Sequence, residues 1–303
     1  MLILVLLAAT AASFAVSERL KLETVPIDRT HVINKVFSPV CGCIKRVATV
    51  DFRLRRADRV TFSILSMDRH LVRRLAAKQH FAAGKASFTW NGRDEEGVLQ
   101  PDGTYRVRVE LARHGRTINL PNLIRIDTRK PVVTSTARPR PAHISPDGDR
   151  HGDFVEVAYA VSEHAQGILY LKGRRIVLGR FQKLRDHVLW YGLKHGKGLP
   201  AGRYRLAVGA RDPAGNLAKP VPAGTVEIRY MALEPSVVRV GSKQRFRVTV
   251  LTDAKAYRWR IGHRHGFGAG PILRLRAPAA PGRHVLYVEE RGHAARAVLL
   301  VHE

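Results

Sequence analysis

One turn occurs twice in this chain, and it constrains the fold more than any other feature. The first copy, "WNGRDEEGVLQPDGTY", runs from Trp90 to Tyr105, and the second, "WYGLKHGKGLPAGRY", runs from Trp190 to Tyr204. Each copy leads into a segment in which apolar and charged residues alternate, as they do in a half-buried β-strand. The sequence therefore predicts an internal repeat of about 100 residues.

The segments before the two turns also match each other. A Ser-Pro pair begins at Ser38 in the first copy and at Ser145 in the second. Each pair is followed by an alternating segment, and in a strand such alternation places the apolar side chains on one face. We expect the following residues to face a core: Val50, Phe52 and Leu54 in the first copy, and Val155, Val157, Tyr159 and Val161 in the second.

Short alternating segments continue to the end of the chain. A third block of similar pattern begins near Pro235, with apolar residues alternating with arginines. Several short strands, with turn signals about every eight to twelve residues, are typical of antiparallel β-sandwiches. We predict three sandwiches, over residues 35–134, 144–230 and 235–303, and we interpret the Pro-rich segment 136–143 as a stiff linker.

Together these motifs resemble the immunoglobulin-like domain of the flagellar hook-capping (FlgD-type) family. The family pattern joins a Ser-Pro-Asn/Asp-Gly-Asp opening to a Trp-x-Gly-x-Asp turn and a Pro-x-Gly-x-Tyr entry into the next strand. The matching residues are Trp90, Gly92, Asp94, Gly97, Pro101, Gly103 and Tyr105 in the first copy, and Trp190, Gly192, Pro200, Gly202 and Tyr204 in the second. The second copy keeps the opening, whereas the first departs from it.

The resemblance covers roughly residues 35–230 and is more specific for the fold than for the function. It implies an all-β chain of tandem antiparallel immunoglobulin-like β-sandwiches, two of them FlgD-type and the third a further bacterial domain of the same kind. Such domains are additions to many exported bacterial proteins. The helical assembly region of the hook-capping protein is not found in this sequence, so a flagellar role does not follow.

We interpret the repeated turn as a strand connection. Its glycines allow the positive φ of tight turns, and its Trp and Tyr would each gain roughly 2–3 kcal/mol by burial. The acids Asp94–Glu96 of the first copy could suggest acid–base chemistry. The second copy has Lys194 and His195 near that place. A structural turn tolerates such an exchange and a catalytic turn does not.

Two groups of residues could bind metal. Asp147, Asp149 and Asp153 lie in "DGDRHGD", and their spacing could wrap a calcium ion, although an Asp/Gly-rich stretch is also an ordinary turn. His263 and His265 could share a metal if both lie on one face of a strand, but solvent-exposed histidines at a turn are the favoured interpretation. Calcium is the only cofactor that the sequence suggests.

Cys41 and Cys43 are the only cysteines of the chain and flank a single glycine. A disulfide across one residue is strained, a pair of thiolates falls short of the four ligands that structural zinc requires, and a pair of free thiols is the third alternative. In an exported chain the disulfide is favoured.

The amino terminus predicts the compartment. Residues 1–16 carry no charged side chain, and charges begin at Glu18. This run is short for a membrane span, which needs about 20 apolar residues, and its length also suits the core of a signal peptide. We expect residues 1–22 to form an apolar helix that anchors extracytoplasmic domains in the cell membrane, or a signal that is cleaved to give a secreted protein. A buried strand or helix of the first domain is the alternative.

The net charge of +27 indicates an anionic partner or an arginine-rich residue usage. Of the 52 basic residues, 39 are arginine, spread along the chain. Arginine is always charged and binds phosphate or carboxylate through two hydrogen bonds. An anionic envelope polymer or another envelope protein is therefore the expected partner, if the charge has a functional cause.

No catalytic motif stands out, since the sequence has no Gly-x-Ser-x-Gly elbow, P-loop or GxGxxG. We expect a non-catalytic structural or binding module of the cell envelope. The alternatives are an accessory domain set of a secreted hydrolytic system and a basic nucleic-acid-binding protein. The latter is less favoured, because no recognised motif or aromatic platform among the arginines is evident in the sequence.

Overall fold

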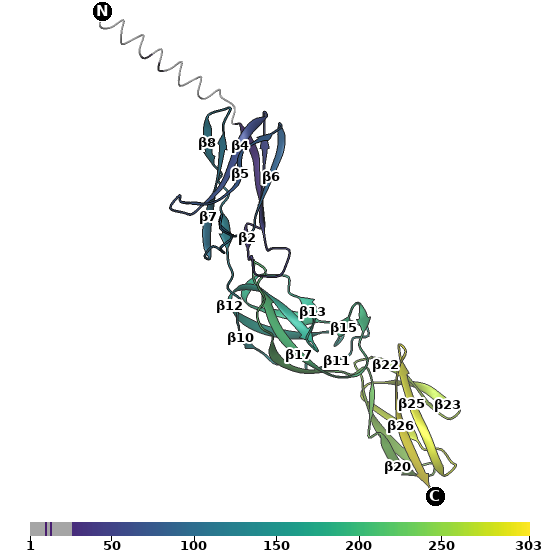
Figure 1. Cartoon of the computed structure of the whole chain (residues 1–303). Coiled ribbons are helices and arrows are strands. Elements are labelled where there is room, and N and C mark those ends of the chain that lie inside the picture. The colour runs from purple at the N-terminus through teal and green to yellow at the C-terminus, as the bar shows by residue number, and fades with distance from the viewer. Residues whose placement is uncertain (1–9, 11–12, 14–25) are drawn as a thin grey trace, which may run out of the picture. The chain divides into compact units, whose positions relative to one another are not determined.

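The computed structural model describes Thr10, Ser13 and residues 26–303 and divides the chain into two units (Figure 1). The first unit contains residues up to 129 and the short segment 213–216, and the second contains residues 130–212 and 217–303. From residue 26 onward, every regular element is a β-strand. The predicted helix over residues 1–22 lies outside the described residues, apart from those two positions. No helix among the described residues is long and apolar enough to cross a membrane.

The first unit is a sandwich of two sheets. One sheet has the order β1–β3–β6, and the other has the order β2–β9–β7–β4–β5 with β8 beside β7. The strands are β1 (Ile27–Ile33), β2 (Val36–Phe37), β3 (Ala48–Leu54), β4 (Asp58–Leu65), β5 (Leu71–Phe81), β6 (Gly84–Trp90), β7 (Gly103–Leu111), β8 (Arg116–Asn119) and β9 (Ile124–Ile126). The expected core residues of β3 are each 1% exposed, which confirms the predicted alternation.

Aromatic side chains fill the space between these two sheets. Phe62 of β4 stacks on Phe88 of β6 with ring centres 4.2 Å apart. Trp90 of β6 meets Tyr105 of β7 edge-on at 4.9 Å. Aromatic pairs of this kind contribute about 0.5–1.5 kcal/mol beyond the burial of their area. They therefore hold the two sheets together.

The second unit begins with a sandwich built around one long strand, β12 (Val155–Leu171). The first half of β12 pairs with β10 (Val133–Thr136) and β14 (Lys183–Trp190). The second half pairs with β13 (Arg174–Leu178) and β17 (Gly202–Arg211). The pairing register shifts between Ala160 and Ala165. One strand therefore passes from one layer of the sandwich to the other, as strands at sandwich corners do.

Four short strands complete this sandwich. β18 (Val221–Ile228) pairs with β17, and β11 (His143–Ile144) pairs with β18. The hairpin β15 (Leu193–Lys194) and β16 (Lys197–Gly198) forms part of the second copy of the repeated turn. The predicted core residues of β12 are all buried.

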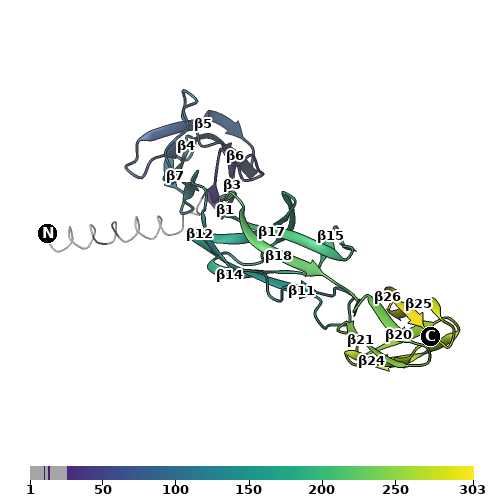
Figure 2. The same cartoon turned by 90° about the horizontal axis from the view of Figure 1, so that it is seen from below.

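The second unit ends with a smaller sandwich, whose two sheets have the orders β19–β21–β24 and β20–β26–β25–β22–β23 (Figure 2). The strands are β19 (Ala232–Glu234), β20 (Val237–Gly241), β21 (Arg245–Leu251), β22 (Ala256–Ile261), β23 (Arg264–Ala269), β24 (Ile272–Arg276), β25 (Gly282–Glu290) and β26 (His293–His302). Leu286, Ala297 and Leu299 lie at the centre of its core. The prediction of tandem all-β sandwiches is confirmed.

The repeated turn makes the same hydrogen bonds in both copies. In each copy the indole N–H of the Trp donates to the carbonyl three residues later, and the Tyr hydroxyl donates to the carbonyl of the Pro four residues earlier. The bonds are Trp90 to Arg93 and Trp190 to Leu193, both 2.9 Å, Tyr105 to Pro101 at 2.7 Å and Tyr204 to Pro200 at 2.6 Å. The polar atoms that these aromatic side chains bring into the core are thus satisfied.

One glycine in each turn permits a close approach to the Ser-Pro opening. A Cβ on Gly92 would lie 2.5 Å from Cγ of Pro39, and a Cβ on Gly192 would lie 2.6 Å from Cγ of Pro146. Both glycines also have positive φ, +76° and +64°. This packing explains why the opening and the turn occur together in both copies. Gly103 does not have the positive φ expected of the turn glycines.

The segment interpreted as a linker belongs to the second sandwich, so that interpretation is wrong. Residues 133–136 form β10, residues 143–144 form β11, and the backbones of Arg140 and Glu156 exchange hydrogen bonds of 2.9 and 2.8 Å. Proline suits sheet edges as well as linkers, and composition does not distinguish the two. The first core also begins before residue 35, because β1 pairs with β3.

Candidate functional site

The third sandwich carries a face of arginines that have no acidic partners among the described residues. Strands β21 and β24 run antiparallel, so that Arg245 lies directly opposite Arg276, and Arg247 lies directly opposite Arg274. Directly opposed residues have Cβ atoms about 4.5–5.5 Å apart on one face of the sheet. We call the surface formed by these four residues the arginine face.

No acidic side chain within residues 26–303 neutralises the arginine face. All four arginines are exposed, and none forms an ion pair. The acid closest in the strand register is Glu234 of β19, opposite Thr249, and it forms no ion pair either. Like charges directly opposite each other destabilise a sheet. The arginine face is therefore unfavourable for the isolated chain and favourable for binding an anion.

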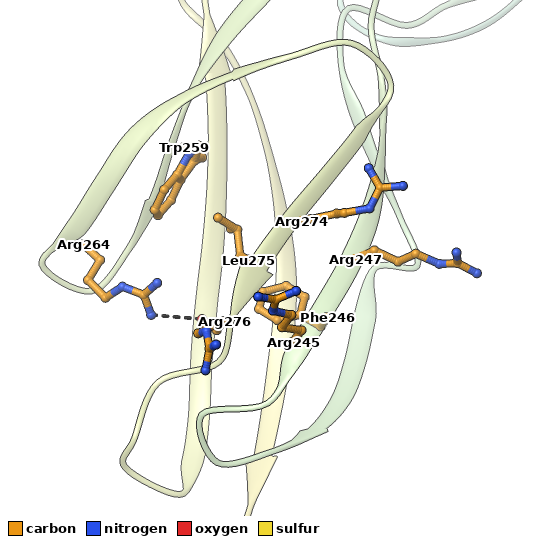
Figure 3. Close-up of a pocket in the computed structure, with 8 residues that line it drawn as sticks. All are labelled: Arg245, Phe246, Arg247, Trp259, Arg264, Arg274, Leu275 and Arg276. Atoms are coloured by element: carbon orange, nitrogen blue, oxygen red, sulfur yellow. Dashed lines mark hydrogen bonds between the residues drawn. The ribbon is translucent and has the colours of Figure 1, made fainter.

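A pocket of about 680 Å³ lies beside the arginine face (Figure 3). Phe246, Trp259 and Leu275 form its apolar lining. Arg264 reaches across from β23, and its Nη1 donates to the carbonyl of Arg276 at 2.9 Å. In Figure 3, the side chains of Arg247 and Arg274 both extend away from Trp259. An apolar surface bordered by cationic groups suits a ligand that is anionic and partly apolar.

A second cationic surface lies on the other sheet of the same sandwich. Arg258 of β22 lies over the ring of Phe267 at 5.7 Å, and Arg260 lies over the ring of Tyr287 at 4.9 Å. The Phe267 side chain is 76% exposed. We call these four residues the aromatic platform. Stacked arginine and aromatic side chains offer flat faces to the rings of a ligand.

Sequence reasoning missed the aromatic platform, although a signal for it exists. Phe267 stands between two glycines of β23. A Cβ on Gly266 would lie 2.9 Å from the ring of Trp259, and a Cβ on Gly268 would lie 2.4 Å from the ring of Tyr257. The two glycines thus make room for aromatic residues on the core side, while the residue between them points outward. A Gly-Phe-Gly strand beside an Arg-rich strand is the pattern that indicates this surface.

The three predicted calcium ligands fall into two roles. Asp153 accepts hydrogen bonds of 2.9 and 2.7 Å from backbone N–H groups of its own loop, one at each carboxylate oxygen. Asp147 and Asp149 lie instead with Asp253, from the loop after β21 in the same unit. One ligand oxygen of each of these three acids lies within 4.8 Å of the others. We call them the acidic cluster.

Burial raises the pKa of Asp147 and of Asp253 above the usual range of an aspartate. Neighbouring carboxylates, Asp149 among them, add to the rise in both cases. Arg291 lies near enough to Asp147 to oppose the rise. Withdrawal from water is thus the main cause of the raised pKa values, and repulsion between the carboxylates is the smaller one.

The two cysteines and the two histidines that the sequence singled out lie in different parts of the fold. Cys41 and Cys43 are joined in a disulfide, with 5.2 Å between their Cα atoms. His263 lies in the turn after β22 and His265 lies on β23. Both are exposed, and neither belongs to a group of potential metal ligands within the described part of the chain.

Two acids of the first turn, Asp94 and Glu95, accept hydrogen bonds from neighbouring groups of the first sandwich. The carboxylate of Asp94 accepts hydrogen bonds from the backbone N–H of Val98 and from Nε2 of Gln100, both at 2.8 Å. Glu95 accepts a hydrogen bond from the backbone N–H of Arg74 at 2.7 Å. These bonds support the interpretation of the turn as a strand connection.

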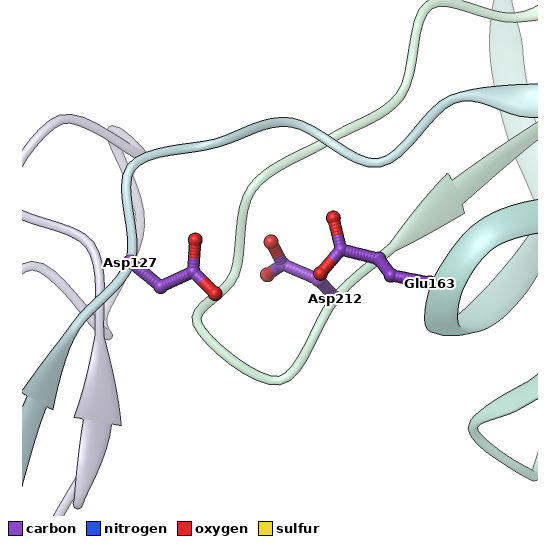
Figure 4. A group of neighbouring side chains, drawn as sticks. All are labelled: Asp127, Glu163 and Asp212. Carbon is purple, nitrogen blue, oxygen red and sulfur yellow. The ribbon is translucent and has the colours of Figure 1, made fainter. Parts of the chain in front are cut away.

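Another pair of acids lies inside the second sandwich (Figure 4). The carboxylates of Glu163 and Asp212 lie within 4.8 Å of each other, and Asp212 is 1% exposed. Both make further interactions, so we treat the pair as structural. Asp127, drawn in the same figure, belongs to the first unit, where its carboxylate accepts a hydrogen bond from the backbone N–H of Arg129 at 3.2 Å.

Comparison with known proteins supports the fold. Residues 45–115 match the model of the FlgD Ig-like domain, which confirms the resemblance in the first sandwich. The chain is thus a multi-domain β protein whose residues 45–115 match a FlgD Ig-like domain. No curated protein matches it.

Several solved structures share this kind of architecture. The fibronectin(III)-like modules of Clostridium thermocellum CbhA are 13% identical, with 64% of this chain and 88% of that chain covered and a TM-score of 0.35. FlgD from P. aeruginosa is 19% identical, with 46% and 89% covered and a TM-score of 0.25. SGBP-B of Bacteroides ovatus, solved with a mixed-linkage heptasaccharide, is 14% identical, with 84% and 63% covered and a TM-score of 0.26. At TM-scores below 0.5, these similarities say nothing about ligand or activity.

Proposed function

We propose that this protein is a non-catalytic binding module that holds an anionic envelope polymer on the arginine face. The observation that carries the proposal is the pairing of Arg245 with Arg276 and of Arg247 with Arg274, with no acid to neutralise them. Each guanidinium group is always charged and can bind a phosphate or carboxylate through two hydrogen bonds. A row of such groups matches the repeated charges of a polymer better than it matches one small anion.

The net charge of the chain supports the same partner. At +27, the protein attracts polyanions over a distance of about one Debye length. The arginine face then supplies short-range contacts at one place. Another envelope protein with an acidic surface is the other partner that this charge would suit.

We also propose that the chain is exported and either anchored or released. The uncharged residues 1–16 support export, and a disulfide between Cys41 and Cys43 suits an oxidising compartment. Cell fractionation with amino-terminal sequencing tests this proposal. A new amino terminus near Val16 indicates secretion, and an intact Met1 in the membrane fraction indicates an anchor. An intact chain in the cytosol would contradict export.

A binding panel tests the polymer proposal. The full chain is applied to an immobilised glycerol-phosphate polymer, to polygalacturonate and to neutral dextran. We expect salt-sensitive binding to the two anionic polymers and none to dextran. Replacing the four arginines of the arginine face by Gln should lower the affinity at least tenfold.

The matched control removes the same charge elsewhere in the second unit. It replaces four exposed arginines of the second sandwich by Gln: Arg174, Arg175, Arg203 and Arg205. We expect the control to lose little affinity. An equal loss in both variants would show that net charge alone is responsible, and the arginine face would no longer be the site.

A single-stranded nucleic acid is the second candidate, and the aromatic platform is the observation that favours it. Base stacking on an exposed aromatic side chain is worth about 1–3 kcal/mol. Single-stranded DNA is therefore added to the panel, with the Phe267→Ala variant. A preference for DNA over the glycerol-phosphate polymer that is lost in this variant would favour nucleic acid.

A further inference from the structure

Two loops of the second unit bring three carboxylates together. Asp147 and Asp149 come from the loop before β12, and Asp253 comes from the loop after β21. The first loop belongs to the second sandwich and the other to the third. A sequence distance of 104 residues separates Asp149 from Asp253, so only the fold brings these acids close.

A buried hydroxyl without a partner lines the same pocket as Asp253. Ser145 is 5% exposed, and its Oγ forms no hydrogen bond among the described residues. Oδ1 of Asp253 is also buried without a partner. Both residues line one pocket of about 330 Å³.

These unsatisfied oxygens are unfavourable as they stand. A buried polar atom without a partner is destabilising, and more so when it is charged. The hydroxyl and the three carboxylates share one chemical property, since each offers an oxygen to a hard cation. Asp147 and Asp149 already accept backbone hydrogen bonds at Oδ1, so a cation would satisfy Ser145 and Asp253 and would balance most of the negative charge.

We propose that Asp147, Asp149 and Asp253, together with the hydroxyl of Ser145, bind one calcium ion. Calcium takes six to eight oxygen ligands in a flexible geometry at about 2.3–2.6 Å. Three carboxylates and a hydroxyl supply the protein side of such a shell, and water completes it. Magnesium demands a shorter and nearly regular octahedron, so the site prefers calcium.

One glycine makes the approach of the two loops possible. Gly152 has a φ of +60°, and a Cβ there would lie 2.8 Å from Oδ2 of Asp253. Any other residue would push Asp253 away from the first loop. Asp153 closes that loop through its two backbone hydrogen bonds and so positions the ligands without being one of them.

Basic side chains also lie near the acidic cluster. Arg229 and His143 line the pocket of Asp253 and Ser145, and neither forms an ion pair with the cluster among the described residues. Arg291 acts on Asp147, but its Nε is paired with Glu290 at 3.1 Å. His151 has its Nδ1 3.6 Å from Oδ2 of Asp149 and is a cation only when protonated. Bound calcium therefore fixes the loop after β21 against the loop before β12. This site is separate from the arginine face, and neither proposal depends on the other.

Isothermal titration of the full chain with calcium chloride, after removal of calcium with EGTA, tests the proposal. We expect one site, with magnesium binding much more weakly. Asp253→Asn should lower the calcium affinity at least tenfold, and Ser145→Ala several-fold. Glu156→Gln removes an exposed carboxylate of the same sandwich and should leave the affinity unchanged.

Two results would overturn the proposal: no calcium binding by the wild-type chain at millimolar concentration, or undiminished binding by Asp253→Asn. Circular dichroism and thermal unfolding in EGTA show whether each variant is folded. If Asp253→Asn does not fold, Asp149→Asn makes the same test from the other loop and must weaken calcium binding to the same extent.

Discussion

The first sandwich and the second unit treat their carboxylates in opposite ways. In the first sandwich, Asp58 is 2% exposed and pairs with Nδ1 of His114 at 2.5 Å. Asp51 pairs with Nζ of Lys85 at 2.8 Å. In the second unit, no Lys or Arg within the described residues forms an ion pair with any member of the acidic cluster. The fold thus pairs the first group with basic side chains. In the second group, Asp147 and Asp149 each accept a backbone hydrogen bond, of 3.1 and 2.7 Å, whereas Oδ1 of Asp253 is buried without a partner among the described residues.

The pKa values of the two groups accordingly move in opposite directions. Burial alone would raise the pKa of Asp58, but hydrogen bonds from His114 and two backbone N–H groups outweigh it and hold the pKa low. Hydrogen bonds from Lys85 and Ser87 lower the pKa of Asp51. In the acidic cluster, burial and the neighbouring carboxylates raise the pKa values of Asp147 and Asp253. A carboxylate satisfied by the fold is structural, whereas one left unsatisfied marks a site for something outside the chain.

The largest expected loss of stability concerns the turn glycine that packs on the Ser-Pro opening in both units. Gly92→Ala places a Cβ against Pro39, and Gly192→Ala places one against Pro146. The positive φ costs an alanine about 1–2 kcal/mol, and the overlap costs about 1–3 kcal/mol. Each variant should lose about 2–4 kcal/mol in its own sandwich, measured by hydrogen exchange of that sandwich.

Matched glycines in the same turns separate the two causes. Gly97 and Gly196 also have positive φ, but a Cβ there would meet nothing within 4 Å. Their alanine variants should lose only the backbone contribution, about 1–2 kcal/mol. If Gly92→Ala lost no more than Gly97→Ala, the packing of the turn on the Ser-Pro opening would not matter for stability.

The next largest expected loss of stability concerns Asp58 of the first sandwich. Asp58→Asn removes a charge that the first sandwich satisfies with three hydrogen bonds. Hydrogen bonds to charged groups contribute about 1.5–3 kcal/mol, so the first sandwich should lose about 2–3 kcal/mol in a denaturant titration at pH 7. An unchanged midpoint would contradict a structural role for Asp58.

The same substitution in the acidic cluster should have the opposite sign. Without calcium, Asp147→Asn relieves repulsion and should stabilise the second unit by about 0.5 kcal/mol. With saturating calcium, the variant should be less stable than the wild type, because bound ligand stabilises the folded state. Thermal unfolding in EGTA and in calcium measures both. A loss of stability in both buffers would mean that Asp147 is structural.

The smallest effect is a difference in pH dependence between the units. The pKa of Asp58 is lowered, so its stabilising contribution is present above the ordinary aspartate pKa of about 3.9 and is lost as the pH falls through the lower folded value. The pKa values of Asp147 and Asp253 are raised, so in calcium-free buffer the second unit gains stability as the pH falls from neutral through those values.

Other groups that face the acidic cluster do not change this expectation. Asp149 and Asp153 repel the charge of Asp147 and Arg291 attracts it, while Arg229 and His143 line the pocket of Asp253. Hydrogen exchange at pH 7 and pH 5 measures both units in one sample. Parallel changes in the two units would contradict the comparison.

The cores could be predicted from the sequence, because strand geometry repeats every two residues. Val50 and Val157 were placed on the buried face by alternation alone, and the turn motif located the hairpins. The Pro-rich segment 136–143 could not be placed, since proline marks linkers and sheet edges alike.

The sites depend on distant pairing and could be predicted only in part. Asp147 and Asp149 stood out through their spacing, but Asp253 is a lone acid in the sequence, and its role depends on the fold. Similarly, "QRFRVTV" and "ILRLRAP" show which arginines point outward. That Arg245 lies opposite Arg276 depends on the register between two strands, which neither segment reveals by itself.

The most direct measurement of the proposed function is the salt dependence of binding to the glycerol-phosphate polymer. Each cation that contacts a polyanion releases counterions and steepens the plot of log affinity against log salt. Removing the four charges of the arginine face should make this slope shallower by about 2–4, whereas the control variant of the second sandwich should change it by less than about 1. Equal slopes in the two variants would contradict a binding site on β21 and β24.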